Sequence, residues 1–300
     1  MKVSSLLRLY EEGKRNFAGA NLSGADLSKV TLIGVSLTGA NLMGANLSRA
    51  FLIKSDLSGA NLNWANLSFV KMSEAKLIEA DLTKANLSGA FMVNSQLRGA
   101  KLSGANICGA NLRGANLWGA NLCGANLQRT NLREANLSDV NLNWANLGEG
   151  RLMGARLSGA SLNGANFRKA LLKGLDLSGI DLEGVNLSEA RLGGANLEGA
   201  KLVGANLTEA HLPSANLKGA DLTGAKLARA ILEKANLTWT ILSKADLSYA
   251  NLSEATLRGA NLDSTQLSGA ILPESVQNLF SSRSAGTAVS FDGAAGAMVV

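Results

Sequence analysis

The sequence lacks the segments that place a protein in a membrane or send it for secretion. No apolar run in its 300 residues approaches the roughly 18 residues that a membrane-spanning helix needs. Near the N-terminus, Arg8, Glu11 and Glu12 interrupt the apolar residues, so the core of a secretory signal peptide is missing. We therefore expect a cytoplasmic protein with no membrane partner.

Residues that carry chemistry are scarce as well. The chain has one histidine, His211, and two cysteines, Cys108 and Cys123, which lie 15 residues apart. Two cysteines give no disulfide framework, and neither has partners at the spacing of metal ligands. We expect both to be free thiols. A nucleophilic triad would have no candidate base except His211, which stands at an outward position beside Pro213 and is expected on the surface.

Acidic residues and glycines form no convincing site either. Asp176, Asp181 and Glu183 lie close in sequence, but they are expected on two sides of a convex surface. The glycines occur once per five residues and make no phosphate-binding loop. Because an enzyme needs titratable groups that converge in a cleft, we predict no catalytic residue, no cofactor and no metal.

The sequence is rich in one five-residue repeat unit, A-N-L-x-G, which is clearest from Ala100 to Leu127. We call each copy of this unit a phrase. From Phe17 to Leu272 a large apolar residue stands at 52 positions spaced five apart, and 47 of them are leucine. Two residues before these, alanine fills 38 of the 51 positions from Ala20 to Ala270. A period of five fits neither a strand, at two, nor an α-helix, at 3.6.

Residues five apart face one interior if the chain turns by a constant angle per phrase. A quarter turn makes a square coil of about 20 residues, and the repeats then form about 13 stacked coils in a solenoid. At a spacing of about 4.8 Å, backbone groups pair between coils and the leucines form four interior columns. Alanine beside each leucine leaves room for dense packing, and the low aromatic content of 4% suits so narrow an interior.

The A-[ND]-L-x-x phrase resembles that of the pentapeptide-repeat family, over Phe17 to Leu272. The resemblance implies the family's fold, an all-β right-handed quadrilateral β-helix; its handedness does not follow from the spacing. The opening LLRLYEEGKRNFAGANLSGADL is similar to cytoplasmic members from cyanobacteria. The family also suggests mimicry of duplex DNA, which requires strong negative charge. With a net charge of +6, this chain departs from that pattern, and we expect no DNA mimicry.

Shorter segments flank the repeat domain, which is predicted over residues 17–272. Residues 1–16 are predicted to form a helix that caps the first coil, with Ser4 or Ser5 as its N-cap and Gly13 at its end. Residues 273–280 are expected to form a C-terminal cap, and residues 281–300 a disordered tail rich in Ser, Gly and Ala. The residues at helical spacing near the N-terminus are Val3, Leu6, Leu7 and Tyr10.

Three features inside the repeats are interpreted as structural. Asparagine recurs nine times at 20-residue intervals from Asn46 to Asn206, and stacked amides can hydrogen-bond along such a ladder. Glycine fills 26 of the 52 fifth positions while Trp64 and other residues fill the rest, so this corner is predicted to prefer glycine without requiring positive φ. One coil has larger residues in place of alanine, which indicates either a tolerated swelling or a bend that shapes a binding surface. These residues are Leu175, Ile180 and Val185.

Two sets of outward residues on one side of the solenoid are candidate sites. A basic stripe could bind a polyanion, which would relieve repulsion between stacked charges; the alternative is a solvated face. Nearer the N-terminus the same side is apolar, which is typical of interaction sites; the alternative is a seat for the N-terminal helix or the tail. The stripe comprises Arg113, Arg133, Arg151, Lys173 and Arg191, and the apolar set comprises Ile33, Phe51, Ile53, Phe91 and Val93.

Together these features predict a non-catalytic scaffold or regulatory protein that binds another protein through one face of a rigid β-helical rod. The alternative is a polyanion or nucleic-acid binder that uses the basic stripe, and an enzyme is a third class. The salt dependence of binding distinguishes the protein binder from the polyanion binder, since phosphate contacts weaken steeply with salt and apolar contacts do not. Neither the partner's identity nor the oligomeric state follows from the sequence.

Overall fold

Each five-residue phrase closes with a β-turn at its corner. In the first phrase the backbone N–H of Ala20 donates to the carbonyl of Phe17 at 3.1 Å, and the third residue of the turn, Gly19, has a φ of 67°. A positive φ at this position is the mark of a type II turn. The same bond recurs along the repeats, for example from Ala125 to Leu122 at 3.0 Å.

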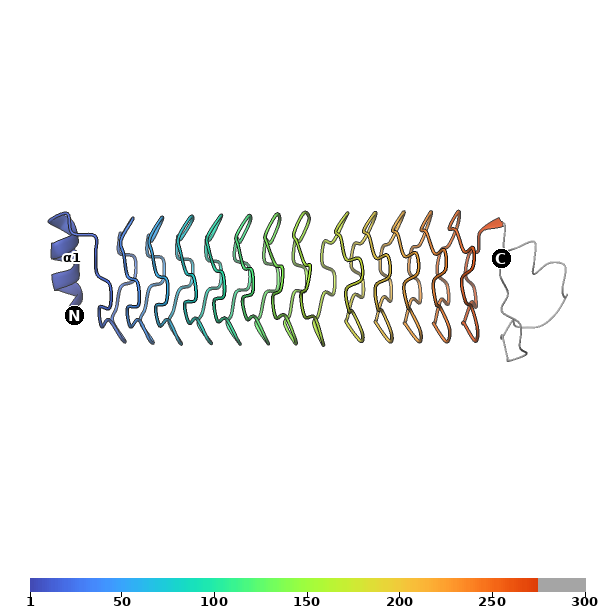
Figure 1. Cartoon of the computed structure of the whole chain (residues 1–300), viewed down its shortest axis with the longest axis horizontal. Coiled ribbons are helices and arrows are strands. Elements are labelled where there is room, and N and C mark those ends of the chain that lie inside the picture. Colours follow the sequence, from blue (N-terminus) through green and yellow to red (C-terminus); the bar gives the residue numbers. More distant parts are fainter. Residues whose placement is uncertain (275–300) are drawn as a thin grey trace. The chain divides into compact units, whose positions relative to one another are not determined.

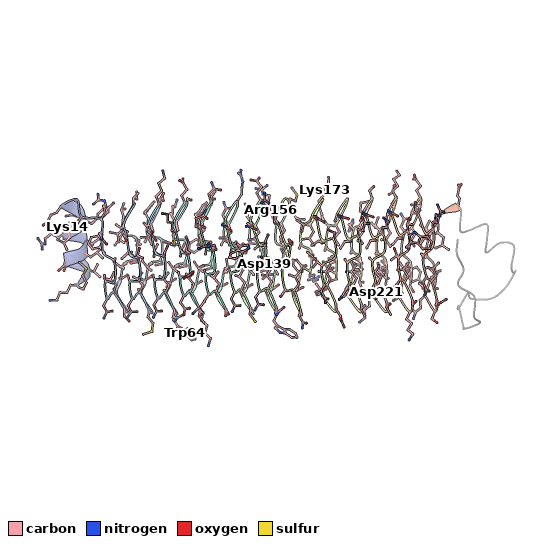
Figure 2. All side chains as sticks on the ribbon, in the orientation of Figure 1. Lys14, Trp64, Asp139, Arg156, Lys173 and Asp221 are labelled. Atoms are coloured by element: carbon pink, nitrogen blue, oxygen red, sulfur yellow. The ribbon has the colours of Figure 1, made fainter. Side chains whose placement is uncertain are left out.

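The prediction that the corners do not require positive φ is wrong. All 51 corner residues from Gly19 to Gly269 have positive φ, and 25 of them are not glycine, with φ between 55° and 61°. Trp64 has a φ of 60°, and its indole projects outward from the corner (Figure 2). Such a conformation costs a non-glycine residue roughly 1–2 kcal/mol. Burial of one leucine per phrase is worth about 1.5–3 kcal/mol and exceeds that cost. The turn therefore forms even where the corner residue is not glycine and disfavours positive φ.

Within each unit, pairing between coils joins one residue of each phrase to the residue 20 positions later, in parallel. The first four such bridges are Asn16↔Ser36, Asn21↔Asn41, Asp26↔Asn46 and Thr31↔Phe51. Each face therefore contributes a single bridged residue per coil, and Figure 1 shows the resulting stack of open loops. Four bridges per 20 residues define a quadrilateral β-helix. The period of 20 agrees with the sequence, whereas the total of 13 coils stays a prediction.

The interior consists of the leucine columns and the small residues between them. Leu22, Leu122 and Leu222 are each at most 1% exposed. Where serine or threonine replaces alanine, its hydroxyl is buried but donates to a backbone carbonyl: Ser55 to Leu32 at 2.9 Å, for example, and Thr130 to Ile107 at 3.0 Å. These bonds remove most of the cost of burying a hydroxyl, so the columns tolerate the substitution.

The asparagine of the phrase stabilises both the turn and the stack. Its side-chain oxygen accepts the N–H two residues later, as Asn46 does from Ser48 at 3.2 Å. Its amide nitrogen donates to the residue one coil earlier: Asn66 to Asn46 at 3.2 Å and Asn106 to Asn86 at 3.3 Å. These bonds confirm the predicted ladder of amides within the first unit.

Helix α1 (Val3–Glu11) lies beside the first coil (Figure 1). Leu6 is fully buried, and the N-terminal amino group of Met1 donates to the carbonyl of Asn21 at 2.6 Å. The predicted serine cap is wrong: Ser4 and Ser5 lie inside the helix, and Lys2 is the N-cap without a side-chain hydrogen bond. The helix begins earlier: the backbone N–H of Leu6 donates to the carbonyl of Lys2 at 3.1 Å, and the bond from Met1 to Asn21 holds the chain ahead of Val3 against the first coils. Gly13, with a φ of 91°, follows the helix as expected.

The computed structural model describes residues 1–274. The chain divides into two units, Met1–Ser161 and Leu162–Val300, and each is considered by itself. Most of the predicted cap at 273–280 and all of the predicted tail at 281–300 lie outside the described residues. The proposed limits of the capping segment, 1–16, and of the repeat domain, 17–272, stay predictions.

The coil with enlarged interior residues belongs to the second unit. Leu175 and Val185 are at most 1% exposed, and Ile180 is 9% exposed. The bonds from this coil to the next remain intact, with Asn196 donating to Leu175 at 2.9 Å and Lys201 to Ile180 at 3.0 Å. The turn bond from Ile180 to Leu177 is longer than most, at 3.3 Å. The coil accommodates the larger side chains with its pairing to the next coil preserved, and the choice between a local swelling and a bend stays a prediction.

Candidate partner-binding face

One face of the first unit carries phenylalanine where the other faces mostly carry asparagine or aspartate. We call it the phenylalanine face and define it by Thr31, Phe51, Lys71 and Phe91, which parallel bridges join in succession. Ile33, Ile53 and Val93 occupy the next outward positions on the same coils. Thus the cross-coil register brings the whole predicted apolar set onto one face.

The apolar side chains of this face are accessible. Phe51 is 37% exposed, Phe91 is 48% exposed and Ile33 is 42% exposed, whereas Ile53 and Val93 are half-buried. The side chains at these positions point away from the leucine columns. Docking of a partner here would remove apolar surface from water at no cost to the core.

Lys71 separates the two phenylalanine rings and interacts with both. Its Nζ lies 5.6 Å from the centroid of the Phe51 ring and 5.5 Å from that of Phe91. Both distances are within the range of a cation–π interaction, about 6 Å. The ammonium group is therefore held between two apolar rings, and Lys71 is itself exposed.

Phe69 adds a third ring that sequence analysis did not assign to the site. It stands at the corner two residues before Lys71 and is 54% exposed. The guanidinium of Arg49 lies 5.9 Å from its ring centroid. Its signal in the sequence is an aromatic residue at a corner that prefers glycine or a polar residue. The backbone conformation of the corner does not by itself indicate that such a residue belongs to an interaction surface.

Helix α1 touches the edge of this face and leaves its rings uncovered. The Tyr10 hydroxyl accepts the backbone N–H of Ile33 at 3.2 Å and lies 3.5 Å from the Ile33 carbonyl. Despite this contact, Phe51 and Phe91 remain among the exposed residues. The N-terminal helix therefore does not pack over the rings of Phe51 and Phe91.

The first unit also holds most of the positive charge. It contains 17 Lys and Arg against 10 Asp and Glu, whereas the second contains 12 against 13. Over residues 29–94, the outward and corner positions of the phenylalanine face carry four cations and one carboxylate, that of Glu74. Lys54 pairs with Glu74 at 3.8 Å. The other cations are Lys29, Arg49 and Lys71, and none has a carboxylate within 4.0 Å among residues 1–274.

The basic stripe is partly neutralised and is divided between the units. In the first unit, Arg113 pairs with Glu134 at 3.6 Å, and Arg133 donates to the side-chain oxygen of Asn131 at 3.1 Å. Arg151 is exposed. The two remaining members, Lys173 and Arg191, are exposed residues of the second unit.

The residues considered for catalysis lie on the surface. His211 is exposed, and its backbone bridges Arg191 and Ile231. The carboxylates of Asp176 and Asp181 each accept the N–H two residues later, at 3.1 Å and 3.0 Å, as asparagine does elsewhere.

Thiols and possible metal ligands offer no further site. Cys108 and Cys123 are free and half-buried. Within residues 1–274 no three His, Cys, Asp or Glu side chains are grouped to hold a metal ion. In the same part of the chain, no helix has the length and apolar character to cross a membrane.

Comparison with known proteins places this repeat in a family. Eight copies of the family model described as pentapeptide repeats match residues 16–49, 45–83, 75–114, 110–148, 151–189, 190–227, 220–259 and 235–273. The chain therefore belongs to the pentapeptide-repeat family, and its repeats form a right-handed quadrilateral β-helix. No curated protein sequence matches it significantly.

Several solved structures are similar to the chain. One is HetL of Nostoc sp. strain PCC 7120, a pentapeptide repeat protein involved in heterocyst differentiation regulation: 36% identity over 90% of this chain and 98% of that one, with a TM-score of 0.24. Rfr23 of Cyanothece 51142 has 26% identity over 52% and 96%, with a TM-score of 0.29. A protein of the Arabidopsis thaliana thylakoid lumen has 28% identity over 39% and 81%, with a TM-score of 0.22.

Proposed function

We propose that this chain is a non-catalytic scaffold or regulatory protein that binds another protein through the phenylalanine face. The observation that carries the proposal is the exposure of Phe51 and Phe91 on either side of Lys71, on one face of the first unit. Exposed apolar groups of this kind are typical of interaction sites. The regulatory role of HetL, 36% identical, agrees with such a function.

The energetics of the face favour a protein partner. Burial of a phenylalanine is worth about 1.5–3 kcal/mol, and binding energy tends to concentrate in a few aromatic anchors. Phe51 and Phe91 would be such anchors, with Ile33, Ile53 and Val93 contributing apolar contact around them. Lys71 would give orientation to whatever binds between the rings.

The polyanion alternative rests on the basic stripe and has less support. Of its five residues, Arg113 is already paired with a carboxylate, and Lys173 and Arg191 belong to the other unit.

A cytoplasmic location belongs to the same proposal. Both cysteines are free thiols, the form that a reducing compartment maintains. The resemblance of the N-terminal segment to cytoplasmic cyanobacterial members supports the same compartment.

The test is an affinity pull-down from an extract of the source cell. It compares the amount of partner retained by the immobilised full-length wild type, by a phenylalanine variant and by a control variant. Phe51→Ser with Phe91→Ser should lose most of the affinity, with a melting temperature close to that of the wild type because neither change reaches the leucine columns. Ile241→Ser with Ile271→Ser, which removes two exposed apolar side chains of the second unit, is the matched control and should retain the partner. Retention at wild-type affinity by the phenylalanine variant would contradict the proposal.

A further inference from the structure

We infer that the partner of the phenylalanine face is an acidic amphipathic helix of another protein, whose carboxylate pairs with Lys71 while apolar side chains contact Phe51 and Phe91. This inference rests on the proposed function and specifies the chemistry of its partner. The charge of the face supports this partner. Lys71 lies beside the rings of Phe51 and Phe91, and Arg49 lies over that of Phe69. The one carboxylate of this face, Glu74, is already paired with Lys54.

Lys71 is the cation best placed for recognition. Its ammonium lies at 5.6 Å and 5.5 Å from the two ring centroids, which fixes the charge in the middle of the apolar surface. A carboxylate that docks there would exchange water for a charge-assisted hydrogen bond. Apolar groups of the partner, seated on the adjacent rings, would shield that bond from solvent, so it would be stronger than an exposed surface pair.

The spacing of the face matches one turn of an α-helix per coil. Phe51, Lys71 and Phe91 occupy three successive coils, which stand about 4.8 Å apart. Successive turns of an α-helix rise about 5.4 Å, and residues i and i+7 lie about 10.5 Å apart. A helix that runs along the face therefore places an apolar residue at i against Phe51, an Asp or Glu at i+3 or i+4 against Lys71, and an apolar residue at i+7 against Phe91.

The aliphatic residues of the face favour a protein over a nucleic acid. The next outward positions hold the aliphatic residues Ile33, Ile53 and Val93. A nucleic-acid base or phosphate would make few favourable contacts with such side chains. An amphipathic helix presents an apolar stripe wider than one residue, and its flanking side chains would cover these three. Arg49, over the Phe69 ring at 5.9 Å, offers a second cation to an acidic residue at the border of that stripe.

The test selects peptides on the full-length protein from a library of helical peptides of about 18 residues, or five turns, randomised at i, i+3, i+4 and i+7. We expect enrichment of apolar residues at i and i+7 and of Asp or Glu at i+3 or i+4. For an enriched peptide, Lys71→Glu should raise the Kd at least about tenfold, equivalent to about 1.4 kcal/mol. Lys101→Glu, which reverses an exposed lysine on another face, should leave the Kd within about twofold.

Other outcomes would overturn the inference in distinguishable ways. Peptides that need Phe51 and Phe91 but show no acidic preference, with a Kd indifferent to Lys71→Glu, would reject the acidic helix and leave the proposed function standing. Tighter binding of a single-stranded oligonucleotide at the same face, with steep loss in salt, would replace the protein partner by a nucleic acid. That outcome would overturn the proposed function as well, as would a phenylalanine variant that keeps its cellular partner.

Discussion

The ring of Phe69 lies in the space that a Cβ on Gly89 would occupy, with its Cε1 atom 2.5 Å from the ideal Cβ position. The two residues stand at corners one coil apart, and both have positive φ, 56° and 63°. The rings of Trp239 and Tyr249 cover Gly259 and Gly269 in the same way. Glycine at these corners thus serves two purposes: it adopts the backbone conformation without strain, and it leaves room for the aromatic side chain of the preceding coil.

This relationship predicts that a Gly→Ala substitution lowers the stability more at a corner covered by an aromatic ring than at a corner with no neighbouring side chain. Gly124→Ala should cost about 1 kcal/mol from backbone strain alone, since nothing lies within 4 Å of its added Cβ. Gly89→Ala should cost about 0.5–1.5 kcal/mol more, because the Phe69 ring must leave its preferred rotamer. Chemical denaturation in a double-mutant cycle with Phe69→Ala measures the difference. If Gly89→Ala costs the same with and without the ring, the steric role of glycine is refuted.

The leucine columns, rather than surface charge, should control stability. Leu122 is fully buried, so Leu122→Ala should destabilise the protein by about 2–5 kcal/mol. Arg113→Ala removes an exposed ion pair with Glu134 and should change stability by less than about 1 kcal/mol. Denaturant unfolding followed by circular dichroism checks both, and the native spectrum should show β structure with little helix. Equal costs for the two variants would argue against the interior assigned to Leu122.

Acid should weaken the turn that Asp176 caps. Hydrogen bonds from the side chain and the backbone N–H of Ser178, with another from Asn196, hold the pKa of Asp176 below its usual value of 3.8. A carboxyl with a lowered pKa in the folded state contributes stability above its unfolded value, and that contribution is lost as the pH falls through the folded value. Asp176→Asn keeps an acceptor for the turn but removes the titration.

The measurement is the free energy of unfolding of the wild type and Asp176→Asn between pH 7 and pH 3. We expect the wild type to be the more stable at neutral pH, with the difference shrinking below about pH 4. A difference that stays constant over this range would show that the carboxylate does not supply the effect.

The sequence predicts the structure best where the position of one residue decides it. The period of five specified the interior leucines, and the asparagine pattern correctly predicted the ladder that joins Asn66 to Asn46. At the corners, intrinsic backbone preference predicts that Trp64 and Lys84 avoid positive φ, whereas the turn requires it. At the N-terminus of α1, the capping preference of serine predicts a later start than the bond from Leu6 to Lys2 gives.

By itself, the sequence determined which side chains face inward and how many residues make a coil. A strict period of five turns one leucine per phrase inward if the chain turns by a constant angle, and that requirement recurs identically along the repeats. Only the tertiary structure decided what the surface presents. Phe51, Lys71 and Phe91 are 20 residues apart in the chain and become neighbours through the bridges between coils. The exposure of their rings and the position of the ammonium between them depend on contacts across coils, which the sequence of a single phrase does not contain.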